Sequence, residues 1–260
     1  MVRAIPDVLA RIVDSKRAAM PRIAANRDAL ERKASERTSF RDFLAGLVAT
    51  RPAVIAEVKK ASPSKGVFAD RFDPAAIARA YASGGAAALS VLTDEEFFQG
   101  SLNDLESARA AVSIPVLRKD FTLDEIHVVE ATAHGADAIL LIAALLDETE
   151  LRKLRELAAR YRMAALVEVH DEADLDAAIG SGAEIVGVNN RNLHTFEVTL
   201  ETSLRLAARI PSSVVKVSES GIDSSASIAA LRAAGFDAFL VGEHLMKAAD
   251  PVAALRALLS

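Results

Sequence analysis

Charged and amide side chains interrupt several short apolar runs of this sequence at or near the end of each run. Glu57 and Lys59 end one run and are two residues apart, so in a strand both side chains face the same side. Lys119 ends a second run, Glu168 lies in a third, and Asn189 lies at the end of a fourth. Burying charged groups is costly unless they are paired or functional. Gathered at one rim, these groups could donate and abstract protons, which predicts acid–base chemistry.

Arg191 lies two residues after Asn189 and adds a guanidinium to this set. The alternative is an ion-pair network that only ties strand ends together. Surface ion pairs, however, do not require charged residues at the ends of several apolar strands. The sequence has no cysteine, which excludes a thiolate nucleophile, a zinc–thiolate site and disulfides. No spacing resembles a metal site, and Asp94-Glu95-Glu96 is expected to be a solvated turn.

Histidines give a weaker signal than the lysines and carboxylates. His127, His134 and His194 are expected at the surface or at helix caps. His170 shares a face with Glu168 but is expected to lie beyond the end of the strand. No catalytic role is therefore assigned to a histidine.

Glycines follow the last two apolar runs, in Ser220-Gly221 and Gly242-Glu243. A glycine in such a turn lets backbone N–H groups approach an anion closely. These turns predict a phosphorylated substrate, with ordinary turns as the alternative. The polar loop that contains Ser62 could close over a substrate or could be a plain flexible loop.

Eight short apolar runs alternate with longer amphipathic runs. The first and the last begin 184 residues apart, so each interval takes about 26 residues, enough for one strand, one helix and two loops. Eight βα units most simply close into an α/β fold of the (β/α)8 TIM-barrel type. An open doubly wound sheet is the alternative, weakened because no G-x-G-x-x-G follows a strand. The predicted strands are Val54–Lys59, Ala87–Leu92, Pro115–Lys119, Ala138–Ala143, Ala164–Val169, Ile185–Asn190, Val214–Ser218 and Ala238–Gly242.

The length of 260 residues matches one such barrel. Residues 1–48 precede the first strand and are predicted to form a helical N-terminal extension packed on the barrel, so residues 1–260 form a single domain. In barrels of this type the active site lies at the carboxyl ends of the strands. That is where the polar residues occur.

Composition narrows the class of protein further. Hydrophobic residues make up 51% of the chain and charged residues 26%, which excludes global disorder. A net charge of -5 argues against a broad nucleic-acid-binding face. No apolar stretch is long enough to span a membrane, and the first residues lack the uncharged core of a secretory signal. We therefore expect a cytoplasmic protein with no membrane or nucleic-acid partner.

Six segments of the chain, taken in order, resemble the signature motifs of the indole-3-glycerol phosphate synthases. The resemblance spans essentially the whole chain, including the extension. It is specific because the six motifs lie on six different predicted strands. The segments are Glu57-Val-Lys59-Lys-Ala-Ser62-Pro63-Ser64-Lys-Gly66, Leu117-Arg-Lys119-Asp120-Phe121, Leu166-Val-Glu168-Val, Gly187-Val-Asn189-Asn-Arg191-Asn-Leu193, Ser218-Glu219-Ser220-Gly221-Ile222 and Leu240-Val-Gly242-Glu243.

The resemblance implies a carboxy-lyase of tryptophan biosynthesis that uses no cofactor and no metal. Its substrate would be 1-(2-carboxyphenylamino)-1-deoxyribulose 5-phosphate, which undergoes ring closure, decarboxylation and dehydration to indole-3-glycerol phosphate. By resemblance Lys119 is the general acid and Glu168 the general base. Lys59 would position the substrate carboxylate and could assist dehydration. Glu57 and Asn189 would bind and orient the reacting centre.

The resemblance also assigns the remaining site residues. Arg191 would pair with the substrate carboxylate or with Glu57, and Glu219 would lie near the ribulose hydroxyls. The carboxylate of Glu243 would repel phosphate, so its side chain is expected to point away. The phosphate cradle would comprise Ser62, Ser220, Gly221, Gly242 and Glu243, and the apolar anthranilate pocket Phe98, Phe121 and Leu140, with barrel packing a strong alternative for Leu140.

Two other functions remain open on the residues alone. Lys119 could form a Schiff base in an aldolase. The chain could also bind a phosphosugar without catalysis, although this leaves the spread of acidic and basic residues unexplained. We expect a monomer, with weak association with other pathway enzymes as an alternative.

Overall fold

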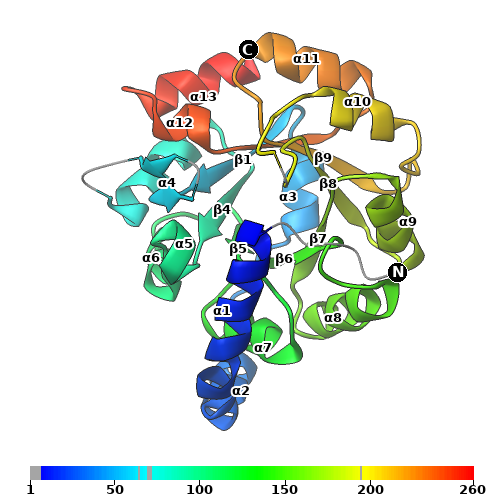
Figure 1. Cartoon of the computed structure of the whole chain (residues 1–260). Helices are drawn as coiled ribbons and strands as arrows, with labels where there is room; N and C mark the ends of the chain where they lie inside the picture. The colour runs from blue at the N-terminus through cyan, green and yellow to red at the C-terminus, as the bar shows by residue number, and fades with distance from the viewer. Residues whose placement is uncertain (1–6, 64, 69–71, 194) are drawn as a thin grey trace.

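The computed structural model describes residues 7–63, 65–68, 72–193 and 195–260. Eight parallel strands close into a barrel in the order β1-β10-β9-β8-β7-β6-β5-β4 (Figure 1). This confirms the predicted (β/α)8 TIM barrel. Two residues singled out in the sequence, Ser64 and His194, lie outside the described residues. The strands are β1 Ala53–Val58, β4 Ala88–Leu92, β5 Val116–Lys119, β6 Ala138–Ile142, β7 Ala164–Val169, β8 Ile185–Asn189, β9 Val215–Glu219 and β10 Ala238–Val241.

Most strand boundaries differ from the predicted ones by one residue. Pro115 precedes β5 because it has no N–H to donate, although its carbonyl accepts a hydrogen bond from the N–H of Leu89 at 2.9 Å. The polar loop after β1 contains a short antiparallel hairpin that the sequence did not predict. It pairs β2 (Ala61–Ser62) with β3 (Gly66–Val67).

Helices surround the barrel on its outer side (Figure 1). Their caps explain where they begin. The side chain of Asp73 accepts from the N–H of Ala76 ahead of Pro74, and Asp147 forms a capping box with Glu150. The helices that follow β1 in the chain are α4 Pro74–Gly84, α5 Glu95–Phe98, α6 Leu102–Ala110, α7 Glu125–Ala133, α8 Glu148–Arg160, α9 Glu172–Gly180, α10 Glu201–Ala207, α11 Ser225–Ala233, α12 Glu243–Met246 and α13 Pro251–Leu259.

The residues before β1 form three helices, α1 (Asp7–Ala24), α2 (Arg27–Ser35) and α3 (Phe43–Ala49), as the amphipathic pattern predicted. α2 packs along α7, and α1 crosses the front of the molecule in Figure 1. Phe43 and Leu47 of α3 are buried against the apolar residues inside the barrel. The extension therefore contributes to the same core as the strands.

A buried carboxylate attaches the extension to the barrel. Asp137, just before β6, accepts hydrogen bonds from Arg37 of the extension, from Arg109 at 3.1 Å and from the N–H of Val116 at 3.1 Å. Asp237, which occupies the same place before β10, accepts from the N–H of Lys216 at 3.1 Å. Asp137 and Asp237 thus tie the start of β6 and of β10 to the neighbouring strands β5 and β9.

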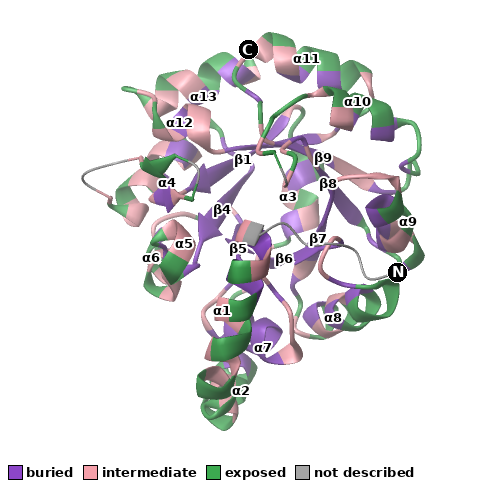
Figure 2. Ribbon diagram, in the orientation of Figure 1, coloured by how far each residue is buried: buried purple, intermediate pink, exposed green. Residues whose placement is uncertain are grey.

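Side chains alternate between the two faces of each strand, and this alternation determines the site. Leu117, Leu166 and Val217 point into the barrel and belong to its inner apolar cluster. Two residues further along the same strands come Lys119, Glu168 and Glu219. Figure 2 shows the strands almost entirely buried. The inner layer is thus apolar up to the carboxyl ends, where it becomes charged. None of the described helices is long and apolar enough to cross a membrane.

Candidate active site

A cavity of about 680 Å³ opens at the carboxyl ends of the strands. Its walls come from all eight strands of the barrel, from the segments that follow them, and from α1. All the site residues named from the sequence line this cavity: Lys119, Glu168, Lys59, Glu57, Asn189, Ser62, Arg191, Glu219, Ser220, Gly221, Gly242, Glu243, Phe98, Phe121 and Leu140.

One lysine lies between two carboxylates at the floor of the cavity. The Nζ atom of Lys119 is 3.1 Å from Oε2 of Glu168 and 3.7 Å from Oε2 of Glu219. Glu168 and Glu219 are 3% and 1% exposed, so water screens these charges poorly. Three ionisable groups from β5, β7 and β9 therefore share one desolvated environment.

The protonation states of this group follow from its surroundings. Burial alone would lower the pKa of Lys119, but Glu168, Glu219 and Glu57 outweigh it and raise that pKa. Burial alone would raise the pKa of Glu168, yet the Lys119 ammonium and His170 hold it well below its usual range. Burial, followed by repulsion from Glu168, raises the pKa of Glu219 to about 8 although Lys119 opposes the rise. At neutral pH Lys119 is thus an ammonium, Glu168 a carboxylate and Glu219 a protonated carboxyl group.

A second lysine–carboxylate pair lies at the end of β1. Nζ of Lys59 is 2.6 Å from Oε1 of Glu57, and it lies 5.2 Å from the ring centroid of Phe68. Glu57 is 5% exposed. The spacing of two residues predicted that both side chains would face the cavity, and both line it.

Asn189 connects the floor of the cavity to its rim. Its side chain helps to lower the pKa of Glu168, and its Oδ1 accepts from the backbone N–H of Arg191 at 3.0 Å. The Arg191 guanidinium donates to the carbonyl of Phe196 at 3.3 Å and lies 3.9 Å from Glu243. Arg191 therefore pairs with Glu243, whereas Glu57 pairs with Lys59.

The loop after β9 has an unusual backbone. Ser220 and Gly221 both have positive φ values, 67° and 76°, and Nδ2 of Asn190 donates to the carbonyl of Ser220 at 3.1 Å. A positive φ is rare for a residue other than glycine, such as Ser220. Backbone conformations of this kind cluster at binding and active sites. Across the cavity, the buried hydroxyl of Ser62 has no hydrogen-bond partner within the part of the chain that the structure describes.

The carboxylate of Glu243 lies among cations at the rim. Its Oε1 is 2.6 Å from Nζ of Lys247 and 3.7 Å from Nζ of Lys65, and Arg191 approaches the other oxygen. These cations offset its charge beside the loops predicted to bind phosphate. The pKa of Glu243 is lowered, chiefly by the hydrogen bond from Lys247.

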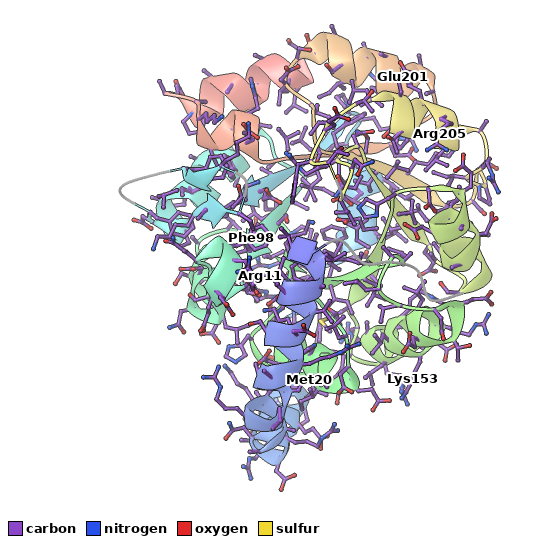
Figure 3. The ribbon with its side chains drawn as sticks, in the orientation of Figure 1. Arg11, Met20, Phe98, Lys153, Glu201 and Arg205 are labelled. Atoms are coloured by element: carbon purple, nitrogen blue, oxygen red, sulfur yellow. The ribbon has the colours of Figure 1, made fainter. Side chains whose placement is uncertain are left out.

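One wall of the cavity is apolar. The rings of Phe98 and Phe121 are 6.4 Å apart and tilted by 38°, and Leu140 is buried nearby in the barrel. Figure 3 labels Phe98 on α5 and Arg11 on the neighbouring helix α1. The sequence did not predict that α1 would line the cavity, because no local pattern indicates where a helix outside the barrel packs. The residues concerned are Val8, Leu9 and Ile12.

The expectation that Asp94-Glu95-Glu96 is a solvated turn was wrong for Asp94. This carboxylate is 2% exposed, accepts from the N–H of Phe97 as the N-cap of α5, and pairs with Lys16 of α1 at 2.9 Å. Lys16 also pairs with Asp120 at 2.6 Å. These ion pairs hold α1 beside the loops after β4 and β5.

Arg118 and His170 adjoin the site but do not line the cavity. Arg118 points away from the cavity and pairs with Asp120 at 3.1 Å and Glu130 at 2.8 Å. His170 follows β7, as expected, but its Nε2 lies 3.3 Å from Glu168. Its spacing of two residues from Glu168 indicated the shared face but not that the two side chains come close together.

The arrangement suits proton transfer on an anionic aromatic substrate. An ammonium can donate a proton to a developing oxyanion, and a neighbouring carboxylate can accept one. The cavity adds an apolar wall and a cationic rim. Among the residues the structure describes, no group of three or more His, Cys, Asp or Glu side chains is placed to hold a metal ion.

Comparison with known proteins agrees with this site. The family model described as indole-3-glycerol phosphate synthase matches residues 9–258. An indole-3-glycerol phosphate synthase of Polaromonas naphthalenivorans is 50% identical over 256 residues, covering 96% of this chain and 97% of the relative. One of Burkholderia vietnamiensis is 51% identical over 255 residues, with 96% and 97% coverage.

A solved structure supports the fold alone. The thiamine phosphate pyrophosphorylase of Pyrococcus furiosus superposes with a TM-score of 0.61 at 16% identity, over 83% of this chain and 95% of that one. The sequence matches are far closer and extend over nearly the whole chain. Together with the lysine–carboxylate cavity, they show that this chain belongs to the indole-3-glycerol phosphate synthase family.

Proposed function

We propose that this chain is a carboxy-lyase that converts 1-(2-carboxyphenylamino)-1-deoxyribulose 5-phosphate to indole-3-glycerol phosphate, a step of tryptophan biosynthesis. The observation that carries the proposal is the Lys119 ammonium, 3.1 Å from the ionised Glu168 in a largely buried cavity. The apolar wall suits the aryl ring, and the rim suits an anionic phosphate.

Ring closure is the first step of the proposed reaction. The aryl carbon that bears the carboxylate forms a bond to the carbonyl carbon, and Lys119 donates a proton to the carbonyl oxygen. The raised pKa of Lys119 keeps this proton in place until negative charge develops on the oxygen. Loss of CO2 then returns its bonding electrons to the ring and restores aromaticity.

Dehydration completes the reaction. The hydroxyl formed in the first step leaves as water after protonation, and Glu168 accepts the proton lost from the neighbouring carbon. Its lowered pKa supports this role because the carboxylate is ionised at neutral pH. In this scheme Lys59 holds the substrate carboxylate and assists dehydration, while Glu57 and Asn189 orient the reacting centre.

The remaining assignments concern binding. Arg191, Ser62 and the loops that contain Ser220-Gly221 and Gly242-Glu243 would hold the phosphate, and Glu219 would lie near the ribulose hydroxyls. Phe98, Phe121 and Leu140 would contact the anthranilate ring. The proposal further includes a cytoplasmic monomer of one domain, residues 1–260, that binds no nucleic acid.

A turnover assay tests this function. Purified protein is mixed with the arylamino deoxyribulose phosphate, and indole fluorescence is followed. Lys119→Ala and Glu168→Gln are each expected to lower kcat by about 10²-fold or more, the scale of general acid–base catalysis. No turnover by wild-type protein at micromolar concentration would contradict the proposal, and near-normal kcat in either variant would contradict its assigned role.

The Schiff-base alternative predicts a different outcome. An aldolase that uses Lys119 as a nucleophile would be trapped covalently by borohydride in the presence of a sugar phosphate. We expect no adduct, because the raised pKa of Lys119 leaves its amine protonated. Mass spectrometry of the treated protein distinguishes an aldolase from a synthase, and an adduct on Lys119 would favour the aldolase.

A further inference from the structure

His170 lies between two buried carboxylates behind the proposed catalytic base. Its Nε2 is 3.3 Å from Oε1 of Glu168, and its Nδ1 is 3.4 Å from Oδ2 of Asp174. The His170 side chain is only 12% exposed. The three groups form a row that runs from α9 into the cavity.

The backbone fixes this row. His170 directly follows β7, so the strand alternation turns it to the same side as Glu168. The N–H of His170 donates to Oδ2 of Asp174 at 3.0 Å, in the first turn of α9. Asp174 is 2% exposed. The imidazole is therefore held from behind by a carboxylate that does not line the cavity.

The two oxygens of Glu168 have different neighbours. Oε2 accepts from Lys119, and Oε1 faces His170. Lys119 lines the cavity, whereas His170 approaches Glu168 from the α9 side. Glu168 can therefore keep one oxygen fixed when a substrate draws Lys119 away from the other.

We propose that His170 is a positioning residue that, as an imidazolium bridging Asp174 and Glu168, holds the Glu168 carboxylate ionised and oriented for proton abstraction. This inference rests on the proposed function, because it assigns Glu168 as the base. His170 makes no contact with the reacting atoms in this scheme. It acts through Glu168.

The charges around His170 support this state. Two carboxylates face it, Glu168 from β7 and Asp174 from α9, and Lys119 of β5 pairs with the other oxygen of Glu168. Burial alone would lower the pKa of His170, but its interactions with Asp174 and Glu168 outweigh burial and raise it to about 9. His127, which is buried beside Arg118, has its pKa lowered to about 4 and provides an internal contrast.

A purely structural role would be to fasten the start of α9 to the end of β7 through Asp174. Two substitutions separate this role from the proposed one. The amide nitrogen of Gln replaces Nε2 and keeps a donor facing Glu168, whereas that of Asn replaces Nδ1 and faces only Asp174. A positioning role therefore favours Gln, and a structural role favours Asn.

The first experiment measures kcat against pH for wild type, His170→Gln and His170→Asn. We expect His170→Asn to lose about 10-fold in kcat, less than the about 10²-fold of a direct acid or base, and His170→Gln to lose clearly less. In both variants Glu168 loses a cationic neighbour, so its pKa rises and the acid limb of the profile moves to higher pH. An unmoved acid limb, or rescue by Asn rather than Gln, would overturn the proposal.

The second experiment needs no substrate. Nitrogen chemical shifts of 15N-histidine-labelled wild-type protein report whether both ring nitrogens of His170 carry protons, with His170→Gln identifying its signals. We expect a doubly protonated ring at pH 7 and a lower titration midpoint in Asp174→Asn. A neutral His170 ring at pH 7 would overturn the inference. Because this readout is independent of turnover, a failed turnover assay alone would count against the proposed function only.

Discussion

The carboxylate of Glu219 occupies the space that a β-carbon on Gly187 would need. Gly187 lies in β8 beside Glu219 of β9, and both residues face into the barrel. The end of β10 repeats the arrangement, where Gly242 leaves room for the carboxylate of Glu57. Gly242 has a negative φ of −120°, so the space it leaves explains this glycine better than its backbone does. Two glycines thus make room for two buried carboxylates of the cavity.

Gly187→Ala should displace Glu219 from its position beside Lys119. The added methyl group would overlap with Oε1 of Glu219 and would lie 3.1 Å from Leu166 Cδ1. We expect kcat to fall by about 10-fold or more while the fold is retained, because the displaced side chain belongs to the acid–base group. Steady-state kinetics and far-ultraviolet circular dichroism measure these two effects.

A double-mutant cycle provides the control for this substitution. Glu219→Asp shortens the carboxylate side chain and frees space for the new methyl group. The double variant should therefore lose less than the sum of the two single losses. Strict additivity would mean that Gly187 acts independently of Glu219.

The stability of Glu219→Gln relative to wild type should increase as the pH rises. The pKa of Glu219 is raised from 4.5 to about 8, so the folded state binds its proton more tightly than the unfolded state. Between these values the free energy of unfolding contributed by Glu219 falls with increasing pH. The stability of the variant relative to wild type, measured by urea unfolding, should therefore rise by roughly 3 to 4 kcal/mol between pH 5 and pH 8.

Glu168→Gln is the matched comparison and should behave in the opposite way. The pKa of Glu168 is lowered, so its ionised form stabilises the folded protein at pH values above its unfolded pKa of 4.5. Its loss should destabilise the protein at pH 7. Equal effects of the two substitutions at pH 8 would contradict the assigned protonation states.

Gly221→Ala should weaken substrate binding more than it slows the chemical step. Gly221 has a φ of 76°, and a β-carbon there would lie 2.6 Å from Cγ1 of Val198. The loop proposed to hold phosphate would have to move. We expect KM to rise by about 10-fold with a smaller change in kcat, the pattern of lost uniform binding.

Val198→Ala in the Gly221→Ala background removes the clash but leaves the strained φ. KM should therefore recover in part. Val198 is 39% exposed, so this change should cost little stability by itself. An unchanged KM in Gly221→Ala would argue against a phosphate-binding role of the loop.

Asp137→Ala should strongly destabilise the protein. Asp137 is 1% exposed, and its loss leaves Arg37 and Arg109 without their shared carboxylate. Removing one partner of a buried ion pair typically costs about 3 kcal/mol or more. Asp237→Ala is the control at the equivalent place before β10, where the paired Arg51 is 62% exposed and the loss should be smaller. The free energy of unfolding in urea measures both.

The sequence predicted the barrel and the inward-facing residues because both follow from short-range periodicity. Alternation along single strands was enough to place Lys119 and Glu168 on a common face. The residue types at the strand ends then indicated acid–base chemistry. The boundary at Pro115 was missed by one residue, although the missing N–H of proline could have indicated it.

The rest depended on contacts between distant segments. Asp94 was expected in solvent, but Lys16, far away in the sequence, pairs with it and covers it. The same absence of local signal concealed α1 as a wall of the cavity. Gly187 looked like an ordinary strand residue, because its role depends on Glu219 on the neighbouring strand.

The N-terminal extension contacts both ends of the barrel. Ile12 of α1 borders the cavity at the carboxyl ends of the strands, and Phe43 of α3 is buried inside the barrel near their amino ends. These two contacts belong to one continuous piece of chain, so loosening either end leaves the other less firmly held. Amide hydrogen exchange in α3 should therefore slow when a ligand fills the cavity, although α3 contributes no residue to it.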